Sequence, residues 1–371
     1  MKRLLFLVLP FLLCGCTHDM NREEIDEIDL VLVLGIDYDD GDYNLSALYS
    51  TGGGADSEEG TGSGAEQVAK GKGKTAYEAL EDLKQKNKKN ITLAQAGSFL
   101  IGEEAAKQGI DRALDFLKRD ETIKMEALVY IIKDMKASEF IEEGIKNKQT
   151  IHEDLEAMKQ KQKALMTRND NSFVNILNDM EQSYSSVLIP YLVGEKSGLL
   201  IEGYAVFDEL KLVDYLDRDT SDGVNFIRNI MRSFPIYLKD GVSLAVSYTN
   251  TKLKADLVKN KIFVTVKVDF ESMLKEIITK ENIFTTEELL RLTDAQNEYV
   301  ISILEKPVNY SKSKGLDIFN LARIVENQNV SGWKGIEGNW DQLISNIEYQ
   351  FQVRSQITKS FILGNNKNNN K

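Results

Sequence analysis

The sequence predicts a multi-domain α+β protein, with mixed or antiparallel sheets packed with helices, that follows a cleaved lipoprotein signal peptide. Three observations predict it. The first sixteen residues combine a charged start, an apolar run and a cysteine. Helix and strand patterns alternate through the first half, and strictly alternating apolar residues mark strands in the second half. Because 371 residues exceed the size of most single cores, two or three domains are expected.

The N-terminus has the pattern of a bacterial lipoprotein signal. Lys2 and Arg3 precede an apolar run over residues 4–13, which is too short for the roughly 20 residues of a membrane-spanning helix. Cleavage before Cys16 would free its amine for acylation, and its thiol would take a diacylglyceryl group by thioether formation. Several acyl chains hold a protein firmly, since each buried methylene contributes about 0.8 kcal/mol. Cys16 is therefore the expected lipidation site, although Cys14 is a less usual residue at its position. The alternative is a secreted protein with a chance cysteine.

Composition limits the classes of partner. Both cysteines lie in the signal, so the folded part has no disulfide and no thiol ligand. Loss of Lys2 and Arg3 leaves 44 basic residues against 58 acidic ones, which moves the formal net charge from -12 to -14. An acidic protein is repelled by an anionic leaflet and by nucleic acid. Lipid must then supply the membrane binding, and no nucleic-acid partner is expected.

Composition shifts and turn signals divide the chain. The expected parts are a signal peptide (1–15), a tether (16–27), an N-terminal α+β domain (28–190), a middle domain (199–255), a C-terminal α+β domain (256–363) and a disordered Asn- and Lys-rich tail (364–371). Within the first domain, residues 52–74 are rich in Gly, Ser, Glu and Lys and predict a mobile loop.

Local patterns predict the elements of the first domain. A strand at 28–36, a tight turn at Asp40-Gly41 and a returning strand at 43–49 form a hairpin. Thr75 with Glu78 three residues later is a capping box that opens a helix. Strands at 96–101 and 127–132, and helices around 110–117 and 140–145, follow. The charged stretch 153–168 predicts a solvated helix or linker.

The second half is richer in alternating strands. These are expected at 203–207, 262–270 and 347–357, with the last two half-buried in an antiparallel or mixed sheet. A helix opened by Thr285, with Glu288 in the capping-box position, is expected to close near Pro307. A second helix around 318–325 precedes Trp333 and Trp340.

The sequence offers little catalytic chemistry. The two histidines are His18, beside the lipidation site, and His152, expected to be exposed in a polar helix start. A zinc site, a cysteine nucleophile and a Ser-His-Asp triad all lack parts. A glycosidase pair of carboxylates stays open in principle, but nothing distinguishes any two acids from surface charge. The sequence therefore predicts no catalytic residue, no metal and no cofactor.

Two motifs resemble ligand sites and fail on spacing. Asp37, Asp39, Asp40 and Asp42 do not follow the calcium-loop template, so a solvated turn is expected. The segment 73–75 resembles the end of a phosphate-binding loop but lacks the required upstream glycine.

Several segments together resemble one family. Residues 200–213 (LIEGYAVFDELKLV), then Tyr215-Leu216 and 223–227 (GVNFI), are similar to the central signature of the Ger(x)C family, the lipoprotein C subunits of spore germinant receptors. Further matches are Leu34-Gly35-Ile36-Asp37, Asp317-Ile318-Phe319, and Trp333 with Trp340-Asp341. They span nearly the whole chain in family order. One departure is the end of the last strand, since 359–364 is longer and less basic than the family pattern.

The resemblance implies a function as well as a fold. It implies a three-domain α+β protein, lipid-anchored on the outer face of the inner spore membrane, that works with a polytopic A subunit and a membrane-embedded B subunit sensing small nutrients. The implied role is non-catalytic, as a scaffold or signal-coupling subunit, and whether this subunit binds nutrient itself stays open. Alternatives are a solute-binding lipoprotein of an ABC importer, which needs two similar lobes, and an anchored envelope hydrolase.

Overall fold

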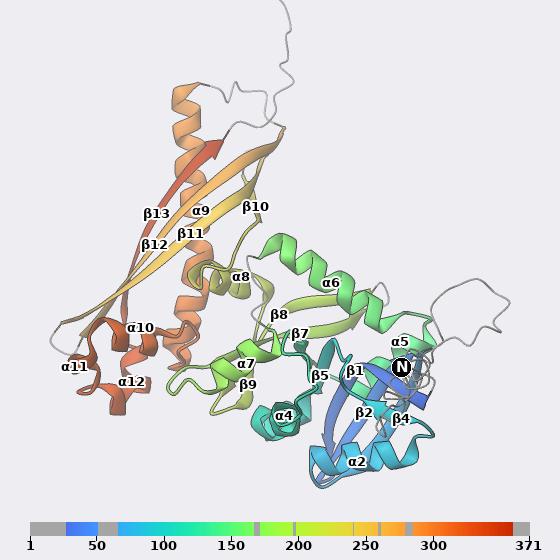
Figure 1. Cartoon of the computed structure of the whole chain (residues 1–371). Coiled ribbons are helices and arrows are strands. Elements are labelled where there is room, and N and C mark those ends of the chain that lie inside the picture. The colour runs from blue at the N-terminus through green and yellow to red at the C-terminus, as the bar shows by residue number, and fades with distance from the viewer. Residues whose placement is uncertain are drawn as a thin grey trace, which may run out of the picture.

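The computed structural model describes residues 27–50, 66–166, 171–195, 198–239, 241–258, 261–278 and 285–358. These residues form two β-sheets with helices packed on them, which is the predicted α+β class (Figure 1). The expectations for the signal peptide, the lipidation of Cys16, His18 and the tail 364–371 lie outside the described residues.

The first sheet has nine strands. Their order is β3-β2-β1-β5-β6-β7-β8-β9, and β4 pairs with β1. Strands β1, β5, β6 and β7 run parallel, and the outer strands pair antiparallel. The bounds are β1 Ile28–Asp39, β2 Asp42–Ser50, β3 Glu66–Gly73, β4 Asn90–Thr92, β5 Ser98–Gly102, β6 Leu128–Ile132, β7 Val187–Glu195, β8 Gly198–Asp208 and β9 Lys211–Leu216.

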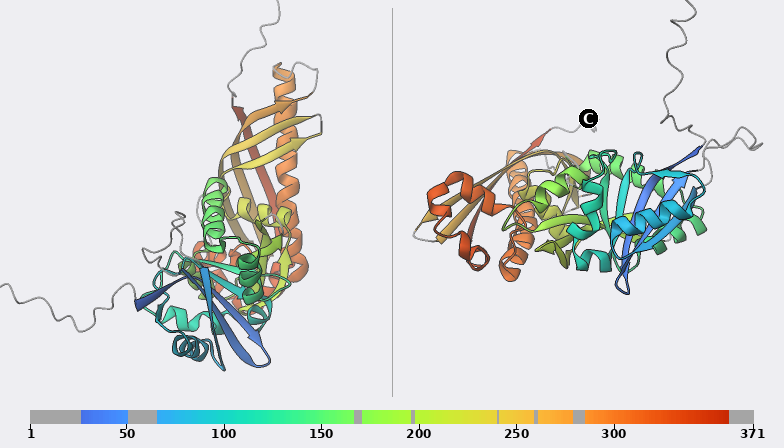
Figure 2. Two further views of the ribbon diagram at one scale, coloured as in Figure 1. Left: turned by 90° about the vertical axis from the view of Figure 1, so that its right-hand side faces the viewer. Right: turned by 60° about the horizontal axis from the view of Figure 1, so that its bottom comes forward.

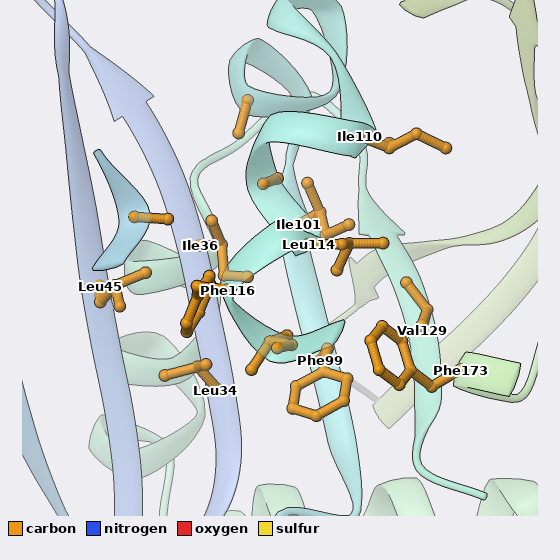
Figure 3. Close-up of a cluster of buried hydrophobic side chains, with 14 of the residues drawn as sticks. Leu34, Ile36, Leu45, Phe99, Ile101, Ile110, Leu114, Phe116, Val129 and Phe173 are labelled. Carbon is orange, nitrogen blue, oxygen red and sulfur yellow. The ribbon is translucent and has the colours of Figure 1, made fainter. Parts of the chain in front are cut away.

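Helices cover both faces of this sheet. One face packs under α2 (Ala76–Lys86), α3 (Glu103–Gln108), α4 (Ile110–Lys118) and α7 (Phe173–Met180). The other face packs under α5 (Ala137–Lys146) and α6 (Ile151–Leu165). The rings of Phe99 in β5 and Phe173 in α7 meet edge to face at 5.5 Å between centroids (Figure 3). Cover on both sides explains why every residue of β5 and β6 is buried.

The predicted hairpin is confirmed. Asp39 at the end of β1 pairs with Asp42 at the start of β2, so the loop has two residues. Both of them, Asp40 (φ 52°) and Gly41 (φ 83°), have the positive φ that such a turn requires.

The predicted loop 52–74 is wrong over its second part. Residues Glu66–Gly73 are strand β3, paired antiparallel with β2. The glycines that suggested a loop instead let α2 lie directly on the strand. A Cβ at Gly71 would be 2.1 Å from the carbonyl oxygen of Ala79, and one at Gly73 would be 2.5 Å from the Ala79 nitrogen. Residues 51–65 lie outside the described part.

Two further helical predictions have different outcomes. The Thr75 half of the predicted capping box is confirmed, since Thr75 Oγ1 accepts from the Glu78 amide at 3.1 Å. Here the Glu78 carboxylate reaches the Lys74 amide, at 2.7 Å, rather than that of Thr75. The charged stretch is helical in α6, but it is not wholly solvated, because Leu155 and Met158 are buried against the sheet.

The second sheet has four strands in the order β10-β11-β12-β13. The pairs β10-β11 and β11-β12 are antiparallel and β12-β13 is parallel, so the sheet is mixed, as predicted. The long helix α9 lies along one face (Figure 2). The bounds are α8 Arg218–Ile227, β10 Phe234–Leu238, β11 Val242–Val258, β12 Lys261–Ile277, α9 Thr286–Lys314, α10 Leu321–Gln328, α11 Val330–Trp333, the 3-10 helix Glu337–Asn339, α12 Trp340–Ile344 and β13 Glu348–Thr358.

The predicted end of α9 near Pro307 is wrong. The helix continues to Lys314 and ends at Gly315, which has φ 69°. Pro307 cannot donate to the Ile303 carbonyl four residues earlier. That carbonyl instead meets Gly223 of α8, where a Cβ would lie 2.4 Å from the Ile303 oxygen and 2.7 Å from Pro307 Cδ. The helix thus continues through a proline, which costs about 3 kcal/mol in a helix interior, at the point where α8 packs closely on it.

The two sheets share part of a core. The hydrophobic cluster under the second sheet includes Leu188 of β7, Tyr204 and Val206 of β8, and Leu216 of β9. Strands β8 and β9, which fall within the expected middle domain 199–255, are hydrogen-bonded to the sheet of the expected domain 28–190. The division into three domains stays a prediction.

Candidate functional site

The signature residues of β8 lie where α8 packs on the strand. A Cβ at Gly203 would lie 2.0 Å from the Leu216 carbonyl oxygen, so only glycine fits there. The Tyr204 hydroxyl donates to Asn225 Oδ1 at 2.7 Å, and its amide donates to Ser221 Oγ at 3.1 Å. These residues attach α8 to the first sheet, so their role in the described structure is packing.

Asp317, from another segment that carries the resemblance, is a buried helix cap. Its side chain is 1% exposed and accepts from the amides of Leu321 and Ala322, both at 2.8 Å, at the start of α10. Its backbone carbonyl accepts from the Ser186 amide at 2.9 Å, and Oδ2 accepts from Ser185 Oγ at 3.4 Å. Burial raises the pKa of Asp317, and the amide donors oppose that rise. Asp317 thus connects α10 to the segment that leads into β7.

Arg228, at the end of α8, also connects the first region, which is the nine-stranded sheet with its helices, to the second region, which is the four-stranded sheet with its helices. Its side chain is 8% exposed, and Nη1 lies 3.8 Å from Asp179 Oδ2 on α7. Nε donates to the Ile318 carbonyl at 3.1 Å, and Nη2 donates to Asn320 Oδ1 at 3.5 Å. We call Asp179, Ser185, Arg228, Asp317 and Asn320 the polar junction.

A hollow of about 470 Å³ lies beside the polar junction. Its walls come from α7, which packs on the first sheet, and from the end of α8, β11 of the second sheet and α10. Asn229 and Asn320 stand in its wall with φ 57° and 59°, a conformation that asparagine tolerates better than most residues. The Asn229 side chain accepts from the Thr251 amide at 2.8 Å, which fixes the end of α8 to β11.

The tryptophan pair of the resemblance belongs to the core. Trp333 and Trp340 are 4% and 1% exposed, and their rings meet edge to face at 5.0 Å between centroids. Tyr184, in the loop before β7, stacks on Trp333 edge to face at 5.4 Å. Aromatic packing therefore adds a second contact between the two regions.

The residues considered for chemistry have structural roles. His152 is half-buried rather than exposed, because α6 packs on the sheet, and burial lowers its pKa. Asp37 is not a solvated turn residue: it is 2% exposed and accepts from the amides of Ala137 (2.7 Å) and Ser138 (2.9 Å) at the start of α5. Burial raises the pKa of Asp37. Among the described residues, no group of three or more His, Cys, Asp or Glu is placed to hold a metal ion.

Asp222 is a partly buried carboxyl group of α8. Asp222 lines a small pocket with Gly203 and Arg218. Burial raises the pKa of Asp222 to about 6, and the nearby Arg218 opposes the rise.

None of the helices within the described ranges combines the length and apolar character that a membrane crossing needs.

Comparison with known proteins identifies the family. Residues 21–193 match the spore germination protein N-terminal domain, and residues 202–360 match the spore germination B3/GerAC-like C-terminal domain. The chain is 19% identical to spore germination protein GerQC of Bacillus cereus, over 97% of this chain and 99% of that protein. It is 23% identical to spore germination protein KC of Bacillus subtilis (strain 168), over 91% and 90%.

The fold also matches a solved structure. The crystal structure of the GerBC protein aligns with a TM-score of 0.54 at 15% identity, over 87% of this chain and 96% of that one. The two domain matches follow each other in order and together cover most of the sequence. The chain therefore belongs to the Ger(x)C family of spore germination proteins, the family of germinant receptor C subunits.

Proposed function

We propose that this chain is the non-catalytic, lipid-anchored C subunit of a nutrient germinant receptor, required for spore germination in response to small-molecule nutrients. The observation that carries the proposal is the match of both family domains in order along the chain. The buried roles of Asp37, Gly203 and Asp317 agree with a protein whose distinctive residues build a shape rather than a reaction centre.

Anchoring is the second part of the proposal. Cys16 carries the acyl chains and holds the protein at the outer face of the inner spore membrane. The signal pattern of residues 1–16 supports this site. The net charge of -12 supports it too, because an acidic chain needs lipid rather than charge to stay at an anionic surface.

Coupling between receptor subunits is the third part. The proposed partners are the membrane-embedded A and B subunits, with no nucleic acid and no cofactor. The shared core and the polar junction support a coupling role, because they join the two sheets through buried side chains rather than a linker. The division into domains 28–190, 199–255 and 256–363 belongs to this proposal.

Deletion of this chain in its host tests the function. Nutrient-triggered dipicolinate release is measured from purified spores that lack redundant receptors, with wild type or Cys16→Ala added back. We expect the deletion to abolish release and only the wild type to restore it. Rescue by Cys16→Ala would remove the anchor from the account, and normal release without the chain would contradict the receptor role.

A further inference from the structure

The hollow beside the polar junction has the size of a small-molecule site. About 470 Å³ falls within the 300 to 1,000 Å³ range of ligand pockets, which form preferentially between domains. Its lining is rich in polar groups, since the asparagines 175, 178, 229 and 320 supply amides. Because a polar hollow gains little from apolar burial, its ligand must be held by hydrogen bonds and charge.

The charges of the lining favour an anion. Three charged residues line the hollow: Arg228, Arg323 and Asp179. Asp179 lies 3.8 Å from Arg228, so these two charges largely offset each other. Arg323 on α10 is exposed and has no salt bridge to any residue in the described part of the chain. The lining residues together carry one net positive charge in a protein whose net charge is -12, and the buried Asp317 interacts with Arg228 from behind the lining.

The remaining polar groups can complete the recognition of a planar anion. Asn178 is exposed on α7 and also lines the hollow, and its side-chain amide can donate to an oxygen. A guanidinium presents paired donors that match the two oxygens of a carboxylate. Ile227, Leu253, Phe319 and Ile324 give the hollow an apolar floor and sides for a short carbon chain.

We propose that this hollow binds a small organic carboxylate, with Arg323 of α10 as the charged contact and Asn178 of α7 as a hydrogen-bond donor. A bound molecule would touch α7 of the first region and α10 of the second, beside the polar junction. Its binding would then stabilise the contact between the two sheets. The proposal stands apart from the germination role, since binding by the purified chain does not depend on a receptor.

Isothermal titration calorimetry on the full-length chain in detergent tests the site. The probes are succinate, L-glutamate and L-alanine as carboxylates, inorganic phosphate as another anion, and glycerol as a neutral control. We expect at least one carboxylate to bind and glycerol not to bind. Arg323→Gln should weaken that carboxylate at least about tenfold, since it removes a charge-assisted hydrogen bond. Asn178→Trp, an exposed position where a large ring fills the hollow, should abolish binding.

The matched control is Arg354→Gln, which removes an exposed arginine of β13 that does not line the hollow. It should bind the carboxylate as the wild type does, and thermal melts should show that all three variants fold. Three results would overturn the proposal: no carboxylate binds at 10 mM or below (on the order of the weakest specific sites), only phosphate binds, or binding survives both Arg323→Gln and Asn178→Trp.

Discussion

The two sheets of this protein differ in how many of their faces are covered by helices. The nine-stranded sheet has helices on both faces, and all residues of β5 and β6 are buried. The four-stranded sheet has helices on one face, and β12 and β13 alternate between covered and open positions. The burial pattern along a strand therefore depends on whether helices cover one face of its sheet or both.

The open face of the second sheet shows the consequence for the surface. Residues 350, 352, 354 and 356 of β13 are Gln, Gln, Arg and Gln, and all are exposed. The first region instead exposes its helices. The regions thus differ in surface while sharing a core through Leu188, Tyr204, Val206 and Leu216.

The largest expected effects test whether that shared core joins the regions. Phe99→Ala in the first core and Trp340→Ala in the second should each lower the free energy of unfolding by about 3–5 kcal/mol. Both side chains are 0–1% exposed. Because strands of the first sheet complete the second core, each variant should shift one common calorimetric transition. Two separate transitions, each moved by only one variant, would break the account of a joined core.

A second comparison is the stability contributed by a buried helix cap, Asp317, and by an exposed one, Thr75. Asp317→Ala leaves the amides of Phe319, Leu321 and Ala322 without their acceptor inside the junction. We expect a loss of about 3 kcal/mol in denaturant unfolding, because an unsatisfied buried donor costs about 1–3 kcal/mol. Thr75→Ala, at a cap whose bond is solvent-exposed, should cost about 1 kcal/mol. Equal losses would show that burial of the junction adds nothing.

Asp222 and Asp37 should respond oppositely to substitution by asparagine. The pKa of Asp222 is raised to about 6 from an ordinary 3.8, so the folded state binds a proton between these values while the unfolded state stays ionised. Wild-type stability should therefore rise as pH falls from 7 to 4, by at most about 3 kcal/mol. Asp222→Asn should remove this rise and stabilise the protein at pH 7.

Asp37→Asn is the comparison in the first region. It should destabilise at pH 7, because Asp37 accepts from two amides at the start of α5 and the NH2 group that Asn puts in place of one oxygen cannot accept. Urea unfolding at pH 7 and pH 5 measures both variants. An unchanged pH dependence in Asp222→Asn would contradict the assignment of the rise to this group.

The smallest effect concerns the open face of the second sheet. Gln352→Ala should change the free energy of unfolding by no more than about 0.5 kcal/mol, since the side chain is exposed and away from the core. Val266→Ala, on the covered face of β12, should cost about 2 kcal/mol. A large loss at Gln352 would mean that this face is covered by something other than solvent.

Local signals were enough to predict the elements whose cause is local. The Asp40-Gly41 turn, the Thr75 cap and the alternation of β12 each depend on a few neighbouring residues. Strand β3 and the passage of α9 through Pro307 could not be predicted in this way. Both depend on how closely a glycine packs on a helix: Gly71 lies under α2, the next element of the chain, and Gly223 lies against α9, which is distant in sequence.

The junction lies beyond sequence reasoning for the same reason. The resemblance pointed to Asp317, but its hydrogen bond to Ser185 spans 132 positions and that of Arg228 to Ile318 spans 90. The helix and strand periods of a sequence do not reveal pairs that are so far apart along the chain. The sequence did not distinguish Arg323 either, because its proposed role depends on a hollow that is lined by four separate elements.

Co-purification from dormant-spore membranes tests whether this chain is part of a receptor. The full chain, tagged at its C-terminus, is isolated in mild detergent from spores carrying either the wild type or Cys16→Ala. The account predicts that the wild type retains the A and B subunits and that Cys16→Ala is depleted from the membrane fraction. Recovery of the intact, membrane-bound wild type without either subunit would contradict it.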